Sequence, residues 1–297
     1  MLKRTLFFSN PLRLTLQDNQ LVVETRDKSR ITTIPIEDIG FVLFDNMQIS
    51  VSLPLIEALV ANNTAVVFCN SKHFPQSMLL NLEGNNTHAE ITRNQINASA
   101  PLKKRLWQQC VQTKIKNQAA VLRSMGKKNA ELNAFANNVK SGDPDNREGA
   151  AARIYWSRMF YDGFIRERFG KYPNNLLNYG YMVLRAAVAR ALTGSGLFPV
   201  LGIHHKNKYN AYCLADDIME PYRPFVDKAV YDIWDNDPES DDLDKEKKAE
   251  LLKVLTMDVQ LDKTRRPLML ALSQTTASLA QCFAGSAMKL KCPAFGN

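Results

Sequence analysis

Apolar and polar residues alternate through the first 80 residues, which predicts short β-strands. Leu12, Leu14 and Leu16 are separated by polar residues, and this period-two spacing is typical of a strand with one buried face. A proline-led apolar run over Pro54–Asn62 predicts a single short helix. Residues 1–83 are therefore expected to form a small, β-rich, sandwich-like N-terminal domain.

The pattern changes after residue 83. Residues 84–101 are rich in Asn, Thr, Ser and Ala, as expected for a linker. From Leu102 onward apolar residues recur at helical spacing. Helices are expected over Ala150–Phe169, Leu176–Leu192 and Leu268–Ala284. The predicted fold class is thus α+β, with a larger all-α C-terminal domain over residues 102–297.

The charge distribution adds a first indication of function. The 297 residues include 38 Lys and Arg against 30 Asp and Glu, a net charge of +8. Residues 101–200 alone hold 17 basic and 6 acidic side chains. A basic region of this kind suits a polyanionic partner such as nucleic acid. An uneven spread of solvated lysines would produce the same count, so charge alone leaves both interpretations open.

Cysteine usage and hydropathy indicate the compartment. The five cysteines are an odd number and include no Cys-x-x-Cys pair, which favours a reducing environment over a disulfide framework. The apolar run near the N-terminus is too short for a signal-peptide core. The longest apolar stretch is interrupted by Arg185 and Arg190, so no membrane span is expected. We expect a cytoplasmic protein without membrane contact.

A histidine pair and two carboxylates lie close together in sequence. His204 and His205 precede Asp217 and Glu220, and the two acidic residues, three apart, share one face of a helical turn. Pro221 places Glu220 near the end of an element. Such residues can converge on a hard divalent cation. Acidic residues beside a basic loop also form ordinary surface ion pairs, and that alternative stays open here.

Glu148 is a third acidic candidate. Asp145 or Asn146 can cap the helix that follows, which places Glu148 in the first turn, where the helix dipole favours an anion. The residues over 149–152 are all small, so a large partner can approach this helix face. A packed helix explains the small residues equally well. A P-loop, a Rossmann glycine fingerprint and an HExxH motif are absent from the sequence.

Four sequence blocks together resemble the CRISPR-associated spacer integrase, the universal adaptation endonuclease. They appear in that family's order, and the predicted domain layout around them also matches. The Met-Glu-Pro-Tyr-Arg form of the last block is most similar to the version found with type II systems. The blocks are Arg147 to Trp156, Asn174 to Tyr181, Gly196 to His205, and Asp217 to Pro224.

The resemblance implies a metal-dependent enzyme that acts on DNA. It assigns one Mn²⁺ or Mg²⁺ ion to Glu148, His205 and Glu220, which are also the catalytic residues. The family pattern has one histidine in the third block, so the presence of His204 leaves a one-residue shift open. Asp217 and Arg223 match positions beside the metal ligands. Residues expected to contact the nucleic acid are Arg147, Arg153, Lys206 and Arg223.

The reaction implied is a transesterification. A spacer 3′-hydroxyl attacks a phosphodiester at the edge of a CRISPR repeat, and with water as nucleophile the same site would be an endonuclease. The implied partners are double-stranded DNA, a second copy in a homodimer with the N-terminal domain expected at the interface, a small dimeric CRISPR adaptation protein and the type II effector nuclease. Alternatives are a strand-transfer enzyme of a mobile element and a non-catalytic DNA-binding scaffold.

Overall fold

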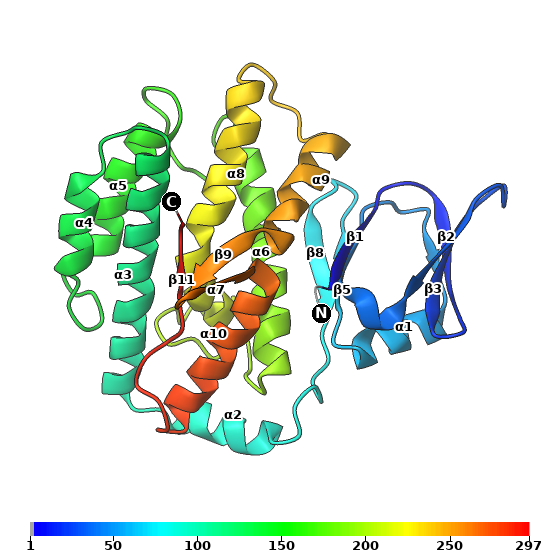
Figure 1. Cartoon of the computed structure of the whole chain (residues 1–297), viewed down its shortest axis with the longest axis horizontal. Helices are drawn as coiled ribbons and strands as arrows, with labels where there is room; N and C mark the ends of the chain where they lie inside the picture. Colours follow the sequence, from blue (N-terminus) through cyan, green and yellow to red (C-terminus); the bar gives the residue numbers. More distant parts are fainter. Residues whose placement is uncertain (1–2, 297) are drawn as a thin grey trace.

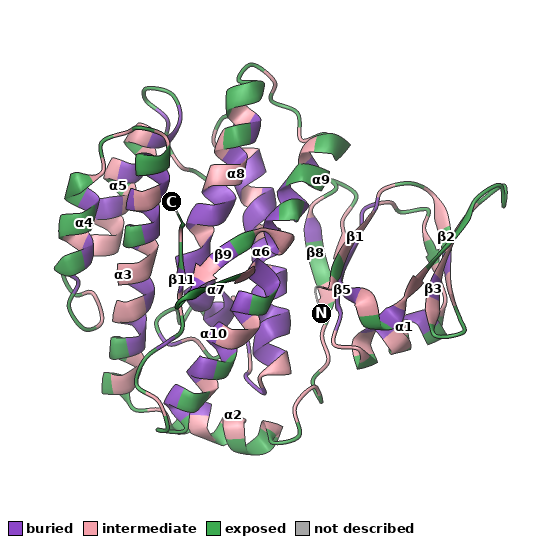
Figure 2. Ribbon diagram, viewed as in Figure 1, coloured by how far each residue is buried: buried purple, intermediate pink, exposed green. Residues whose placement is uncertain are grey.

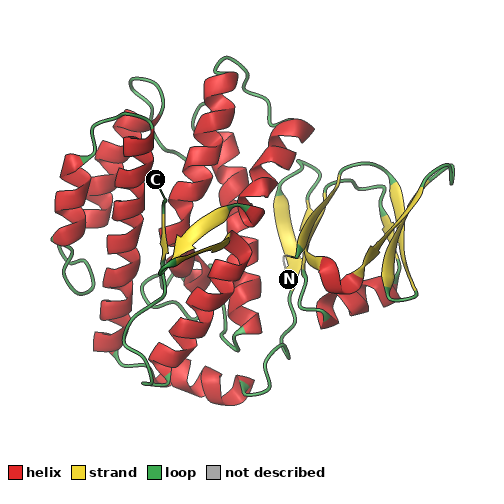
Figure 3. Cartoon of the chain, viewed as in Figure 1, coloured by secondary structure: helices red, strands yellow, loops and turns green. Residues whose placement is uncertain are grey.

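A computed structural model describes residues 3–296 and shows a β-rich N-terminal part beside a larger helical part (Figures 1 and 3). The first sheet has the strand order β1-β5-β7-β8, with β8 antiparallel to β7 and the other pairs parallel. All six residues of β5 are buried, because this continuous apolar run is covered on both faces. The strands are β1 (Arg4–Phe8), β5 (Ile39–Phe44), β7 (Ala65–Cys69) and β8 (Pro75–Leu79).

The second sheet has the order β4-β3-β2-β6. Its strands β2 and β3 form a hairpin whose two turn residues, Asp18 and Asn19, have φ values of 48° and 57°. Both side chains tolerate this left-handed conformation, which a tight hairpin requires. Leu14 and Leu21 point from this sheet into a core shared with helix α1. The elements are β2 (Leu12–Gln17), β3 (Gln20–Thr25), β4 (Ile31–Pro35), the 3₁₀ turn η1 (Ile36–Asp38), β6 (Ser50–Val51) and α1 (Leu53–Ala61).

The C-terminal part packs its helices around α6 (Asn174–Gly194), a long helix with most of its residues buried (Figure 2). Apolar residues on all sides of this helix explain its central place. The other helices and 3₁₀ turns are α2 (His88–Asn97), α3 (Ala100–Ser124), α4 (Ala130–Asn137), α5 (Arg147–Met159), α7 (Cys213–Met219), η2 (Glu220–Tyr222), α8 (Arg223–Asn236), α9 (Lys245–Leu252), η3 (Lys253–Thr256) and α10 (Leu268–Phe283).

The predicted fold class is confirmed, with one correction to its all-α C-terminal domain. A three-stranded sheet, in the order β10-β9-β11, lies among the helices. Its first two strands form a hairpin at Asp262, which has a φ of 54°. The hairpin contains many charged residues, which obscure the apolar alternation that predicts a strand. The strands are β9 (Asp258–Leu261), β10 (Thr264–Pro267) and β11 (Pro293–Ala294).

The largest difference between the predicted and observed helix boundaries lies in α5, which begins at Arg147. The helix expected over Ala150–Phe169 ends at Met159, because Phe160 leaves the helical conformation, with φ −110° and ψ −121°. The chain then turns at Gly163, whose φ is +79°. Aromatic contacts of Phe160 and Phe164 then hold the following loop against the helices. The segment 84–101 contains α2, so the expected linker is partly helical. The domain boundaries themselves stay a prediction.

A buried ion pair joins the two parts of the chain. The Lys248 ammonium lies 2.8 Å from Asp45 Oδ2, and both side chains are almost fully buried. The other oxygen of Asp45 lies 2.9 Å from His73 Nδ1. Asp45 follows β5, whereas Lys248 belongs to α9, so this contact fixes the β-rich part against the helices. Among the helices in residues 3–296, none has the length and apolar character needed to cross a membrane.

Candidate metal centre and nucleic-acid interface

The N-terminus of α5 positions Glu148. Asn146 caps this helix by accepting a hydrogen bond from the backbone N–H of Gly149, at 3.1 Å. The Asp143 carboxylate accepts from the N–H groups of Arg147 and Glu148, at 2.8 and 3.0 Å. The Asn146 cap confirms one of the two capping residues expected from the sequence. The Glu148 side chain, partly buried, therefore projects from a rigid first turn.

Glu220 lies at the junction of α7 and α8, where Pro221 interrupts the helical hydrogen bonding. Its carboxylate is almost fully buried, and Oε1 lies 2.9 Å from Arg223 Nε. The Arg223 guanidinium also covers the ring of Tyr181 at 4.6 Å. Burial opposes ionisation of Glu220, but Arg223 and Lys114 outweigh it and lower the pKa of this carboxyl group. Glu220 is thus held as a buried carboxylate.

Lys114 connects the two glutamates. Its ammonium lies 2.6 Å from Glu148 Oε1 and 2.5 Å from Glu220 Oε2, and the side chain is only 11% exposed. Burial lowers the pKa of Lys114, but the two carboxylates outweigh that effect and raise it. Sequence reasoning missed this residue. The available signal was its place on α3 in the series Trp107, Cys110 and Lys114, which is a buried helix face.

The loop before α7 carries the histidine pair, and Asp217 organises it. The fully buried Asp217 carboxylate accepts hydrogen bonds from the backbone N–H groups of Ile203, His204 and His205, at 2.7, 3.0 and 3.2 Å. His205 Nδ1 lies 2.6 Å from Asp217 Oδ1. This bond raises the pKa of His205, although burial partly opposes it. Asp217 therefore fixes the imidazole through Nδ1, which leaves Nε2 as the ring nitrogen available to a ligand.

The two histidines have different surroundings. The His204 ring stacks on Trp107 with the centroids 4.1 Å apart and the planes 3° from parallel. The His205 ring meets the same indole edge-on at 5.7 Å. His205 has the carboxylate partner that is typical of metal-binding histidines, whereas His204 has a packing partner. This contrast favours His205 over His204 as the metal ligand. The assignment itself stays a prediction.

The four residues expected to contact nucleic acid are not equivalent. Arg153 and Lys206 are exposed, as a backbone contact requires. Arg147 lies over the Phe135 ring at 5.7 Å. Arg223 is enclosed in the site beside Glu220, so the structure brings it together with the acidic residues rather than with the exposed cations. Their contact with DNA stays a prediction.

The donor set suits a divalent metal ion. Carboxylate oxygens and one imidazole are ligands that Mg²⁺ and Mn²⁺ accept. The buried Glu220 Oε2 has no hydrogen bond of normal geometry, although the Lys114 ammonium is close. Within residues 3–296, no three His, Cys, Asp or Glu side chains are already gathered as a complete metal site. Glu148 and Glu220, which already share the Lys114 ammonium, fit a shared cation, and His205 stays the predicted third donor.

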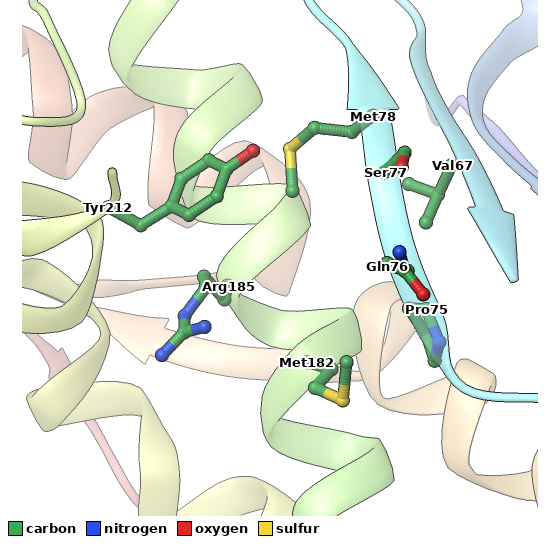
Figure 4. A pocket seen from close by; sticks show the side chains of 8 residues that line it. All are labelled: Val67, Pro75, Gln76, Ser77, Met78, Met182, Arg185 and Tyr212. Carbon is green, nitrogen blue, oxygen red and sulfur yellow. The ribbon is translucent and has the colours of Figure 1, made fainter. Parts of the chain in front are cut away.

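A small cavity lies nearby, between β8 and α6 (Figure 4). Its volume of about 50 Å³ admits one or two water molecules but no nucleotide. Arg185 lines it and is held by Asp216 through hydrogen bonds of 2.7 and 3.1 Å. The cavity thus adjoins α7 without containing the glutamate pair. It is lined by Val67, Pro75, Gln76, Ser77, Met78, Met182, Arg185 and Tyr212.

The fold and this site define an α+β protein with an acidic and histidine centre suited to a divalent cation. The family model described as CRISPR associated protein Cas1 matches residues 6–263, so the chain belongs to the Cas1 family. It is 34% identical over 277 residues to a CRISPR-associated endonuclease Cas1 from Neisseria meningitidis, which covers 93% of this chain and 90% of the relative. A CRISPR-associated endonuclease Cas1 from Francisella tularensis is 28% identical over 244 residues, which cover 72% of this chain and 73% of that relative.

Solved structures agree on the fold. A casposase bound to its integration product superposes with a TM-score of 0.79 at 18% identity, covering 98% of this chain and 93% of that chain. A Cas1 protein from Thermotoga maritima superposes with a TM-score of 0.76 at 17% identity, covering 99% of each chain. The family model and the Neisseria relative confirm the sequence-based assignment to the family. That the chain is most similar to the version found with type II systems stays a prediction.

Proposed function

We propose that this protein is a metal-dependent DNA endonuclease and integrase of CRISPR adaptation. The observation that carries the proposal is the convergence of Glu148 and Glu220 on one cation, beside a histidine that Asp217 orients. Family membership supports this function, because the Neisseria relative is named a CRISPR-associated endonuclease. The casposase of similar fold is bound to an integration product, which supports strand joining as the chemistry.

Glu148, Glu220 and His205 would hold the Mn²⁺ or Mg²⁺ ion. When bound, such an ion would polarise a phosphoryl oxygen and offset the charge that develops in the transition state. Arg223 fixes the Glu220 carboxylate at 2.9 Å, and Asp217 fixes the His205 ring, so both ligands keep one orientation.

The DNA substrates supply the reacting groups. A free 3′-hydroxyl attacks a phosphodiester and releases its proton as a new P–O bond forms. The bond from phosphorus to the old 3′-oxygen breaks, and that oxygen takes up a proton. One ester replaces another, so no nucleotide triphosphate is required. Correct alignment of the two DNAs can contribute roughly 7–11 kcal/mol to the lowering of the barrier. Exposed residues of the basic region over 101–200, such as Arg153, would contact the phosphate backbones, with binding that weakens as salt rises.

The expected assembly is a homodimer that acts with a small dimeric adaptation protein. Two other solved structures of similar fold are complexes whose names include both Cas1 and Cas2, which supports a partner of this kind. The N-terminal domain is proposed as the dimer interface, and an effector nuclease of type II systems as a further partner.

The proposal is tested by strand transfer. Purified protein is mixed with labelled duplex DNA, Mn²⁺ and a supercoiled plasmid that carries a CRISPR repeat, with and without the partner protein. Joining should require both the metal and a free 3′-hydroxyl, and dideoxy ends should abolish it. Glu148→Gln and Glu220→Gln should each reduce joining more than about 100-fold, since loss of even an outer partner costs about 10–100-fold. Glu250→Gln, on an exposed part of α9, is the control.

Two alternatives give different results in this assay. A mobile-element enzyme would prefer transposon ends over the CRISPR repeat. A DNA-binding scaffold would bind DNA in a salt-sensitive way but join nothing in any cation, even with the partner present. Metal-independent joining, or full activity of either glutamine variant, would contradict the proposed metal centre.

A further inference from the structure

The ammonium of Lys114 contacts both of the glutamates that are proposed to hold the metal ion. Its Nζ atom is 2.6 Å from Glu148 Oε1 and 2.5 Å from Glu220 Oε2. Glu148 and Glu220 are the carboxylates that would hold the metal ion, and Lys114 already contacts an oxygen of each. The ammonium and a divalent cation would therefore compete for the same carboxylates.

Charge balance leads to the same conclusion. In the absence of metal, the positive charges of Lys114 and Arg223 match the negative charges of Glu148 and Glu220. A divalent cation added to this mostly buried set would leave two uncompensated positive charges if Lys114 stayed. Uncompensated charge is costly where water is excluded. Withdrawal of the lysine reduces the excess and frees the carboxylate oxygens.

We propose that Lys114 is a positioning residue that holds Glu148 and Glu220 together in the metal-free protein and is displaced when the divalent cation binds. This inference rests on the proposed metal centre. It gives the lysine two effects of opposite sign. The lysine assembles the carboxylates before metal arrives, and it competes with the metal for them.

Mn²⁺ binding to the full-length protein tests the displacement. The electron paramagnetic resonance signal of free Mn²⁺ gives the dissociation constant for wild type, Lys114→Met and Lys116→Met. Lys116 lies on the same helix but is exposed, so it is a matched control. Loss of Lys114 should tighten Mn²⁺ binding by roughly tenfold, the equivalent of one charge-assisted hydrogen bond that the metal no longer has to break. The control should stay within about twofold of wild type.

Thermal unfolding gives an independent readout. Without metal, Lys114→Met should melt at a lower temperature than wild type, because two neighbouring carboxylates lose their shared cation. In saturating Mn²⁺ the difference should shrink, since the metal replaces the lysine in both proteins. A lysine with only a structural role would lower the melting temperature equally in both conditions. If the methionine variant does not fold, Lys114→Gln serves for the same two measurements.

The outcomes separate the two proposals. If wild type binds Mn²⁺ and Lys114→Met binds it equally well or more weakly, the displacement is wrong, whereas the proposed metal centre still holds. Failure of both proteins to bind Mn²⁺ overturns the metal centre and the displacement together. Tighter binding by the variant, with a melting difference that shrinks in Mn²⁺, supports both.

Discussion

Replacement of Asp217 should release the histidine loop from the rest of the site. The fully buried carboxylate accepts four hydrogen bonds from residues 203–205, three from backbone N–H groups and one from the His205 ring. Asp217→Ala removes all four. Asp217→Asn keeps one acceptor oxygen but places an NH₂ group against donors, so it should weaken the same contacts to a smaller extent.

The size of the effect follows from burial. Ile203 is buried, so its N–H finds no water when Asp217 is removed, and an unsatisfied buried donor costs about 1–3 kcal/mol. The exposed His204 and His205 regain hydrogen bonds to water, which limits their contribution. We therefore expect Asp217→Ala to lower the free energy of unfolding by about 3–5 kcal/mol, and Asp217→Asn by about 1–3 kcal/mol.

Urea unfolding and limited trypsin digestion provide the assays. Lys206 and Lys208 lie in the loop, so its release should accelerate cleavage there before the remainder of the chain is attacked. Mn²⁺ binding should weaken about 10–100-fold, because the ligand loses its orienting partner. Asp216→Asn is the control, since this neighbour pairs with Arg185 instead. Equal stability, cleavage rate and Mn²⁺ affinity in the Asp216 and Asp217 variants would refute the reasoning.

Three further expectations concern other parts of the molecule. Lys248→Met should lower the free energy of unfolding by about 3–5 kcal/mol, because the buried Asp45 carboxylate loses its ammonium partner and keeps only the contact with His73. Adding Asp45→Asn should recover part of this loss, and no recovery would contradict the ion-pair explanation. Burial raises the pKa of Asp227 to about 6, against about 3.9 in the unfolded chain, so the folded protein holds the extra proton and its stability should fall as pH rises from about 4 to 6. Asp227→Asn should remove about 3 kcal/mol of that decline, measured as the free energy of unfolding in urea at several pH values. If the variant shows the same decline with pH as wild type, Asp227 is not its cause. His205→Ala should abolish strand joining while His204→Ala retains it, and the reverse result would show that the ligand register is shifted by one residue.

The sequence predicted those features that depend on neighbouring residues. The long apolar series over α6 and α10 located both helices to within two residues. The cap at Asn146 and the break at Pro221 placed Glu148 and Glu220 at helix ends. Each of these signals is local, because capping and proline effects act within one helical turn.

Features that depend on contacts between residues far apart in the sequence were not predicted. Lys114 is 34 residues from Glu148 in sequence, and a single lysine within a helical pattern does not reveal its partner. The pairing of β9 with β11 joins residues about 30 positions apart, between segments that contain few apolar residues. The aromatic residues after Met159 fit a helical spacing, which predicts a longer helix, whereas they form a loop that packs against Trp156 and Trp234.

Helix α3 is the element on which the candidate centre is assembled. Trp107 supports the His204 ring at 4.1 Å, and two turns later Lys114 contacts both glutamates. Glu148 comes from α5 and Glu220 from the α7–α8 junction, so the ligands share no backbone element. Their relative positions are set by one buried helix face. A substitution on this face that changes packing, such as Trp107→Ala, alters the support of the histidine loop without removing any predicted ligand. The relative placement of the three predicted ligands thus depends on the core of α3 as much as on the ligands themselves.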